Sequence, residues 1–254
     1  MTPQQYLEDV LKKYNLTEGE VANLQGHRQY VQGVLETYFG TAIETVYNSG
    51  SYAKGTAVNL GFDLDICPYF KRSSFGTLEE MYFTVLECLR EEDLEAIEQT
   101  VSIHIDAGGN GIDIVPARSL SDGSGNANLY VTTKRNSLLT NIPKHRDYVS
   151  THNARPVIKL MKVWRHRHGI HFKSFALELL VIKALADVPS GADLPSRLRT
   201  ALEFARDHAA DARLLDPANS GNVVSDLIDG NDKQNLARQA GASLAKRTWE
   251  EVLW

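Results

Sequence analysis

The sequence predicts an α+β fold, with a mixed β-sheet lobe that also carries helices followed by a C-terminal helical lobe. Short segments rich in β-branched and aromatic residues, separated by glycine-containing turns, are concentrated in the first part of the chain and are typical of strands. From Pro143 onward, apolar residues recur at helical spacing. We therefore expect a catalytic sheet lobe with N-terminal helices over residues 1–142 and a helical lobe over residues 143–254.

Two helices are expected before the first strand. Residues 3–14 repeat apolar positions at helical spacing and carry proline in the first turn, where it is tolerated. Thr17 and Glu20 form a capping-box pattern ahead of a second helical period, which reaches Phe39 and stops at Gly40. A long helix should therefore lead into the first strand.

The strands are expected to alternate with glycine-rich turns and one helix near residues 78–90. The turn signal at residues 107–110 predicts a hairpin or an adjacent strand pair. The expected strands cover residues 42–48, 62–70, 100–106, 111–117 and 128–132.

In the second lobe, helical periods cover residues 154–168, 174–187, 194–212 and 232–254. No internal repeat or low-complexity tract interrupts them. The Ser-, Gly- and Asn-rich segment 118–128 is the best candidate for a hinge or a boundary.

Composition limits the classes of function. The chain has 254 residues, 43% of them hydrophobic, which is enough to bury a sizeable core. Its 27 Lys and Arg against 32 Asp and Glu leave a net charge of -5, so a nucleic-acid partner would need a local basic patch. Cys67 and Cys88 suggest neither a disulfide scaffold nor a zinc site. With no apolar run long enough to span a membrane, we expect a cytoplasmic protein without a membrane partner.

Two aspartates lie close together on the second expected strand. Side chains two residues apart on a strand point the same way, so Asp63 and Asp65 project together. Phe62, Leu64 and Ile66 then face the opposite side. At about 6 Å in an intermediate dielectric, two carboxylates repel by a few kcal/mol, which a cation between them would relieve. Oxygen-only ligation suits Mg²⁺ or Mn²⁺, which usually complete their shells with water and substrate phosphates.

A third carboxylate is needed if two metal ions are to stabilise both oxygens of an in-line phosphoryl displacement. Asp113, isolated between apolar residues of another expected strand, is the candidate. Gly50 and Gly55 allow close backbone approach, and Ser51 offers a hydroxyl and an N–H, so this turn can cradle phosphates. Taken alone, the Asp-x-Asp pair equally fits the polar face of an edge strand. The Gly-Ser turn and Asp113 favour the metal site.

The order of Gly-Ser, Asp-x-Asp and a later Asp resembles the pattern of the nucleotidyltransferase superfamily that includes DNA polymerase β. Segments 157–164, 173–181 and 214–224 resemble the branch of oligoadenylate synthetases, cyclic GMP-AMP synthase, bacterial cGAS/DncV-like cyclases and archaeal CCA-adding enzymes. The resemblance covers residues 40–230. It implies the nucleotidyltransferase fold, with the active-site cleft between the two lobes.

In that branch, a lysine on the long helix and a serine that opens the next helix contact the donor triphosphate. The matching residues are Lys162 and Ser174, with Lys159 as a weaker candidate one turn earlier. The resemblance also places Asp216 and Asn219 near the base or sugar. Alternatives stay open: Lys162 also fits a surface lysine, Ser174 a plain helix cap, and Asp216 a simple Asp-Pro turn.

Residues 143–173 form the one strongly basic region of this acidic chain. They could neutralise triphosphates or bind an activator, either a nucleic acid or a protein, although part of the strip also fits a solvated helix face.

The resemblance implies attack by a ribose hydroxyl on the α-phosphate of a nucleoside triphosphate, with pyrophosphate leaving and two Mg²⁺ (or Mn²⁺) ions bound. The best match is a compact bacterial cyclase of the antiviral signalling type that makes a cyclic or linear oligonucleotide messenger. Two alternatives remain: an enzyme that modifies an RNA 3′ end or a protein, and a non-catalytic nucleotide-binding sensor.

Overall fold

The chain divides into two units in the computed structural model, which describes residues 1–61, 63–106 and 111–253. We call residues 1–15, 55–60 and 147–254 the helical unit, and residues 16–54 and 61–146 the sheet unit. This division falls a few residues after the predicted boundary at 142/143, and it assigns the first helix to the helical unit. The reason is packing, because Leu7 and Val10 join the core of the C-terminal helices.

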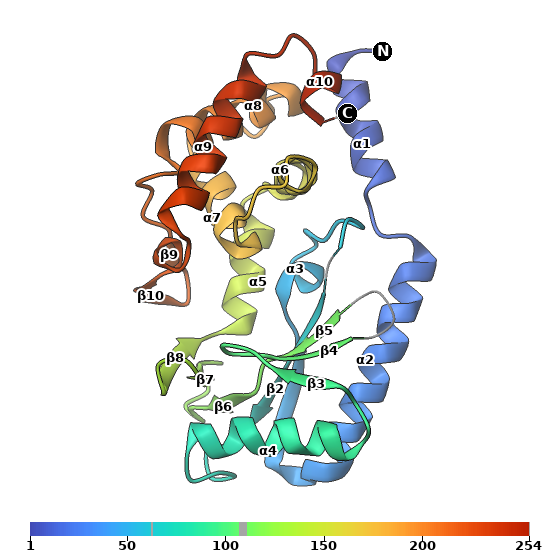
Figure 1. The fold of residues 1–254 in the computed structure, drawn as a ribbon, viewed down its shortest axis with the longest axis vertical. Coiled ribbons are helices and arrows are strands. Elements are labelled where there is room, and N and C mark those ends of the chain that lie inside the picture. The colour runs from blue at the N-terminus through green and yellow to red at the C-terminus, as the bar shows by residue number, and fades with distance from the viewer. Residues whose placement is uncertain (62, 107–110, 254) are drawn as a thin grey trace. The chain divides into compact units, whose positions relative to one another are not determined.

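The sheet unit holds two long helices and a mixed sheet (Figure 1). The predicted strands and the helix after the second strand are confirmed, and Phe62 and the predicted turn at 107–110 lie outside the described residues. Its elements are α2 (Glu18–Phe39), β1 (Ile43–Asn48), α3 (Gly50–Ala53), β2 (Leu64–Phe70), α4 (Leu78–Glu91), β3 (Ala96–Glu98), β4 (Ile103–Asp106), β5 (Gly111–Ile114), β6 (Ala117–Ser119), β7 (Ala127–Val131) and β8 (Asn136–Thr140).

Strand β2 is the centre of the sheet, whose order is β3-β4-β5-β2-β6-β7-β8, with β1 also paired to β2. β5 and β6 both run parallel to β2, whereas the β1–β2, β3–β4, β4–β5, β6–β7 and β7–β8 pairs are antiparallel. Segment 118–128, predicted as a hinge or boundary, is instead the β6–β7 connection within this sheet. Its turn residues are therefore explained by a hairpin.

Helices α2 and α4 bury one face of the sheet. Leu35 of α2 and Met81 of α4 belong to the same buried cluster as Leu64, Ile66 and other strand residues. Because side chains alternate along a strand, the residues between these apolar positions project from the opposite face. That opposite face of β2 and β5 carries the predicted carboxylates.

The helical unit packs around two buried helices. Every residue of α7 from Ala176 to Ile182 is buried, and the Trp164 indole of α6 donates to Ser243 Oγ of α9 at 2.9 Å. The unit contains α1 (Pro3–Lys13), the second half of α5 (Ile142–Thr151), α6 (Arg155–Arg167), α7 (Ser174–Ala184), α8 (Leu194–His208), β9 (Leu215–Asp216), β10 (Asn219–Val223), α9 (Gly230–Leu244) and α10 (Glu250–Leu253).

The prediction of one continuous helix over residues 232–254 is wrong. The structure ends α9 at Leu244 and begins the short α10 at Glu250. Local capping explains the break, because the backbone N–H groups of Arg247 and Thr248 donate to Oε2 of Glu251 at 3.0 and 3.2 Å. Trp254 lies outside the described residues.

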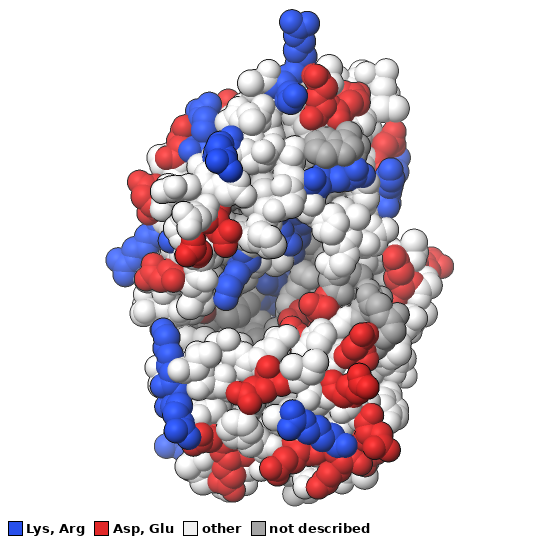
Figure 2. All heavy atoms as spheres, viewed as in Figure 1, with Lys and Arg blue, Asp and Glu red and all other residues white. Residues whose placement is uncertain are grey.

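Charge is mixed over the surface. On the face drawn in Figure 2, Lys and Arg side chains alternate with Asp and Glu, and the described residues form no continuous basic surface there. Within the described part of the chain, no helix combines the length and the apolar character that crossing a membrane requires.

Candidate active site

Two of the predicted carboxylates are register partners on neighbouring strands. Asp65 of β2 pairs with Asp113 of β5, so their side chains leave the same face of the sheet next to each other. Asp63 lies directly before β2. Burial raises the pKa of Asp113, and repulsion from the Asp63 carboxylate adds to this rise, so the Asp63 and Asp113 side chains also lie close together. The structure therefore brings the three predicted aspartates together within the sheet unit.

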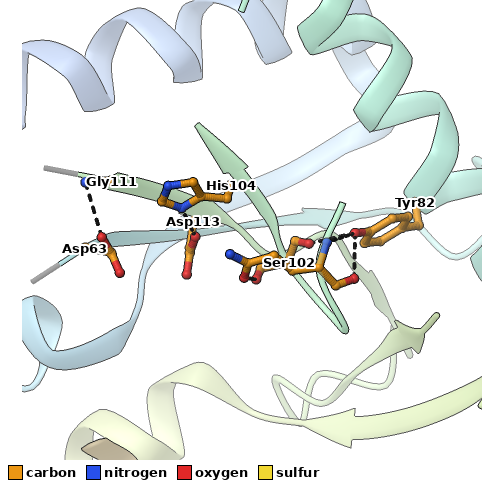
Figure 3. A network of polar contacts seen from close by, with 7 residues as sticks. Asp63, Tyr82, Ser102, His104, Gly111 and Asp113 are labelled. Atoms are coloured by element: carbon orange, nitrogen blue, oxygen red, sulfur yellow. Dashed lines mark hydrogen bonds and ion pairs between the residues drawn. The ribbon is translucent and has the colours of Figure 1, made fainter. Parts of the chain in front are cut away.

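Asp63 is held at the first residue of β5. Its Oδ1 accepts a hydrogen bond from the Gly111 backbone N–H at 3.2 Å (Figure 3). A Cβ on Gly111 would overlap both this Oδ1 and Cε1 of His104. The absence of a side chain at position 111 is therefore what admits the carboxylate to this strand end.

Asp65 packs against the Gly-Ser turn in the same way. Gly50 has φ +60°, and a Cβ there would overlap Oδ2 of Asp65. The backbone N–H of Ser49 donates to the Asp65 carbonyl at 2.7 Å, which fastens the turn to β2. Ser51 follows in the single helical turn α3, so the predicted phosphate-binding turn lies directly beside one of the carboxylates.

Asp113 has a partner that the sequence analysis did not identify. Nδ1 of His104, on β4, lies 2.8 Å from Oδ1 of Asp113. Burial raises the pKa of Asp113 above its ordinary value; the hydrogen bond from His104 opposes this rise and repulsion from Asp63 adds to it. Antiparallel pairing of the expected strands 100–106 and 111–117 was the available signal, because it can place His104 opposite Asp113.

The donor set fits a hard divalent cation in its chemistry. All three side chains offer carboxylate oxygens, the ligands that Mg²⁺ and Mn²⁺ prefer, and the repulsion between Asp63 and Asp113 is what a cation would relieve. Among the described residues, however, no group of three or more His, Cys, Asp or Glu side chains already has the arrangement of a metal site. A Mg²⁺ site of this kind draws its remaining ligands from water and substrate phosphates.

Lys162, predicted as a triphosphate contact, is buried in the helical unit. Its Nζ lies 2.7 Å from Oε1 of Glu178 and 3.1 Å from Oγ1 of Thr56, and only 3% of its side chain is exposed. The Thr56 hydroxyl also donates to Glu178 at 2.5 Å. Sequence analysis did not identify either partner, since Thr56 and Glu178 are distant in the chain.

Ser174 begins α7, as predicted, and its hydroxyl oxygen accepts from Nη1 of Arg165 at 3.1 Å. Arg165 also donates to the carbonyl of Phe172. Burial lowers the pKa of the Arg165 guanidinium, and Glu178 opposes that effect. Since a hydroxyl that accepts from a guanidinium keeps its own proton for donation, Ser174 is oriented as a donor.

The other predicted residues have local partners within the helical unit. Lys159 donates to Oδ1 of Asn15 at 2.7 Å. Asp216 is buried, accepting from Ala218 N at 2.8 Å and from Asn222 at 3.1 Å. Asn219 pairs with Asp216 across the β9–β10 hairpin, so both residues shape this turn.

Several side chains of the predicted basic strip, residues 143–173, are engaged in internal contacts, whereas others, such as Lys144 and Lys173, are exposed. Besides Lys162, its side chains bond within the helical unit as follows: Lys159 to Asn15, Arg165 to Phe172 and Ser174, Arg167 to the Tyr14 hydroxyl, and His168 to the Val252 carbonyl. The alternative of a free basic surface is therefore weakened for these residues.

The mixed sheet carries three aspartates beside a Gly-Ser turn, the pattern that the resemblance to the DNA polymerase β-like nucleotidyltransferases led us to expect. In its fold, the chain resembles that class. Within it, the structure has the fold of the bacterial cGAS/DncV-like nucleotidyltransferases, and the predicted resemblance is confirmed.

Comparisons with known proteins support this assignment, although no family model matches the chain. Cyclic AMP-AMP-AMP synthase of Escherichia coli (strain MS 115-1) is 26% identical over 253 residues, which cover 88% of this chain and 78% of the relative. CdnC of E. coli MS115-1, solved in a CdnC:HORMA-deltaN complex, superposes with a TM-score of 0.79 at 20% identity, covering 99% and 97% of the two chains. CdnG of Bradyrhizobium diazoefficiens in complex with GTP gives a TM-score of 0.80 at 13% identity, covering 94% and 89%.

Proposed function

We propose that this chain is a divalent-metal-dependent nucleotidyltransferase that joins nucleoside triphosphates, releases pyrophosphate, and makes a cyclic or linear oligonucleotide messenger. The observation that carries the proposal is the row of Asp65 and Asp113 on adjacent strands, with Asp63 held next to them by Gly111. Such a cluster is costly for the apo protein, since burial and Asp63 both disfavour the charged form of Asp113. Such a cluster is expected where a bound divalent cation offsets the repulsion between its carboxylates.

The three aspartates would hold the metal ions, and each would do so from a fixed position. When bound, Mg²⁺ would polarise the α-phosphate and lower the pKa of the attacking ribose hydroxyl. Gly111 fixes Asp63, Gly50 leaves room for Asp65, and His104 holds Asp113. This preorganisation supports the proposal, because carboxylate oxygens in fixed positions could hold the cations that a phosphoryl transfer needs.

We assign binding of the donor nucleotide's triphosphate to backbone N–H groups and hydroxyl groups. Gly50 and Ser51 lie in the turn next to Asp65, where N–H groups and a hydroxyl suit phosphate. Ser174, oriented by Arg165, is the candidate from the helical unit. Lys159, Lys162, Asp216 and Asn219 remain weaker candidates, because each already bonds to neighbours.

The product class and the biological role are proposals drawn from the relatives. The curated relative is a cyclic AMP-AMP-AMP synthase, and the related structures include CdnC with ATP and CdnG with GTP. We propose nucleoside triphosphates as substrates, a role in bacterial antiviral signalling and a cytoplasmic location. The CdnC:HORMA-deltaN complex supports the proposal of a protein partner for this chain.

Incubation of the protein with all four ribonucleoside triphosphates and Mg²⁺ tests the proposal. We expect pyrophosphate release and a small phosphatase-resistant product, identified by mass. The double variant Asp63→Asn plus Asp65→Asn should lose at least about a thousandfold in rate, because both bind the ions. Asp187→Asn, at an exposed position of the helical unit, serves as the matched control and should keep the wild-type rate.

Four results would count against the proposal. Absence of pyrophosphate release, or release that survives the double substitution, would refute it. Label from ATP found on an RNA end or on a protein would favour the modifying enzyme. Tight nucleotide binding without turnover would favour the non-catalytic sensor.

A further inference from the structure

His104 occupies the third position of the carboxylate row. In the sheet register, His104 of β4 pairs with Asp113 of β5, which pairs with Asp65 of β2. Side chains at aligned positions of neighbouring strands leave the same face, so the imidazole projects from the face that carries the aspartates (Figure 3). It is therefore part of the site by position as well as by contact.

The imidazole of His104 contacts the Asp113 carboxylate and also Gly111, the residue that binds Asp63. Its Nδ1 lies 2.8 Å from Oδ1 of Asp113. Its Cε1 lies over Gly111, at the spot that Oδ1 of Asp63 also approaches, since a Cβ on Gly111 would overlap both atoms. The ring thus contacts Asp113 and lies beside Gly111, whose backbone N–H holds Asp63.

The chemistry of the His104–Asp113 pair shows which of the two residues carries the proton of their hydrogen bond. A carboxylate that ligates a metal is ionised and can only accept hydrogen bonds, so Nδ1 of His104 must be the donor to Asp113. That bond occupies Oδ1 and fixes the plane of the carboxylate. Oδ2 is then the oxygen that Asp113 presents away from the histidine.

The strand that carries His104 is itself held by a buried network. The Tyr82 hydroxyl of α4 donates to the Ser102 carbonyl at 2.6 Å and accepts from the Gln99 N–H at 3.1 Å. The Ser102 hydroxyl donates to Oε1 of Gln99 at 2.7 Å (Figure 3). Ser102 directly precedes β4, so the start of the strand is anchored two residues before His104.

We propose that His104 is a positioning residue of the metal site, which holds Oδ1 of Asp113 through Nδ1–H and so presents Oδ2 to a divalent cation. This role rests on the proposed function in that it assumes the carboxylates bind metal. It is not a role in proton transfer. Hydrogen-bonded partners of metal ligands commonly set metal affinity by a factor of about 10 to 100.

Three substitutions separate the hydrogen bond from the bulk of the ring. His104→Asn keeps an N–H donor at the position of Nδ1, His104→Gln moves the donor to the position of Nε2, and His104→Ala removes it. His27→Asn on α2 removes a partly buried imidazole elsewhere in the sheet unit and is the matched control. Each variant is checked for an unchanged thermal midpoint, and Mn²⁺ binding is then measured by calorimetry without nucleotide.

We expect His104→Asn and His27→Asn to bind Mn²⁺ within about threefold of the wild type, and His104→Gln and His104→Ala to bind about 10 to 100 times more weakly. The Mg²⁺ concentration that gives half-maximal pyrophosphate release should shift in the same order. His104→Ala with wild-type Mn²⁺ affinity would overturn the proposal. So would His104→Asn as impaired as His104→Ala, because the ring would then act only by packing.

The binding measurement separates this proposal from the proposed function. If the wild type binds Mn²⁺ but releases no pyrophosphate, the proposed function fails while the ranking of the variants still decides the role of His104. If the wild type binds no Mn²⁺, the metal site and the role of His104 are both refuted.

Discussion

At the scale of single residues, two glycines define the site. Gly50 and Gly111 each lie where a Cβ would overlap a carboxylate of the site, so the missing side chain lets the aspartates approach the backbone at these positions. Gly50 also has a positive φ, which disfavours every L side chain. The sequence pattern predicted close backbone approach at Gly50 but not at Gly111. The second could not be predicted because Gly111 meets Asp63 only once β5 lies beside that residue.

Gly50→Ala should abolish pyrophosphate release and lower the free energy of unfolding. The positive φ alone costs about 1–2 kcal/mol, and the clash with Asp65 must displace that carboxylate. Activity and urea unfolding check the result. Gly33→Ala, in the middle of α2 with open space around its Cα, is the control and should leave activity unchanged while stabilising the helix slightly. Wild-type activity in Gly50→Ala would contradict the close approach.

Asp113→Asn should stabilise the metal-free protein while abolishing catalysis. Burial raises the folded-state pKa of Asp113, so ionisation of this carboxyl costs stability at every pH above that value. The amide has no charge to desolvate, and its oxygen can still accept from His104.

The sign of the pH dependence follows from the raised pKa. The gain of Asp113→Asn over the wild type should be largest at neutral pH and should disappear as the pH falls below the unfolded-state value, where both states carry a neutral acid. Thermal midpoints with a chelator present, measured between neutral and acid pH, test this. A gain that grows on acidification would contradict the assignment.

At the scale of elements, the buried pair between α6 and α7 is the main finding that the sequence did not reveal. Lys162 and Glu178 are 3% and 0% exposed, and Thr56 bonds to both. Thr56 belongs to the segment between the Gly-Ser turn and the Asp-x-Asp pair. The helical unit therefore holds the chain that connects the two parts of the motif.

Removing one partner of the buried pair should be far worse than removing both. Lys162→Met or Glu178→Leu alone leaves a buried charge and should cost about 3–5 kcal/mol of unfolding free energy. The double variant should recover most of this loss, which urea unfolding of the four proteins measures. Losses that simply add would show that the two charges do not interact.

The same variants test whether Lys162 contacts nucleotide. If its role is the buried pair, the double variant should have a KM for ATP within about threefold of the wild type, since the loss of a charged hydrogen bond to phosphate would change it by more. A KM for ATP well above that of the wild type in the stable double variant would instead support the contact between Lys162 and the triphosphate that the resemblance implied.

At the scale of the whole molecule, the predicted α+β class and the order of elements are confirmed, whereas the grouping of elements into units differs. Strand and helix periods are local properties, so they could be predicted from neighbouring residues alone. Helix α1 and residues 55–60 join the helical unit because of contacts with residues far along the chain. The partners of basic side chains could not be predicted either: the strip 143–173 is basic in sequence, but Lys159, Lys162 and several other side chains bond inside the helical unit.

The sequence by itself determined the fold class and the candidate site. Gly50, Ser51, Asp63, Asp65 and Asp113 form a pattern whose spacing and residue types are sufficient to indicate phosphoryl transfer, because strand alternation places the acids on one face. Only the tertiary structure decided what surrounds them. The register of β4, β5 and β2 brings His104 to Asp113, and helix packing gives Lys162 a buried partner in Glu178. Both are contacts between distant segments, which no local pattern encodes.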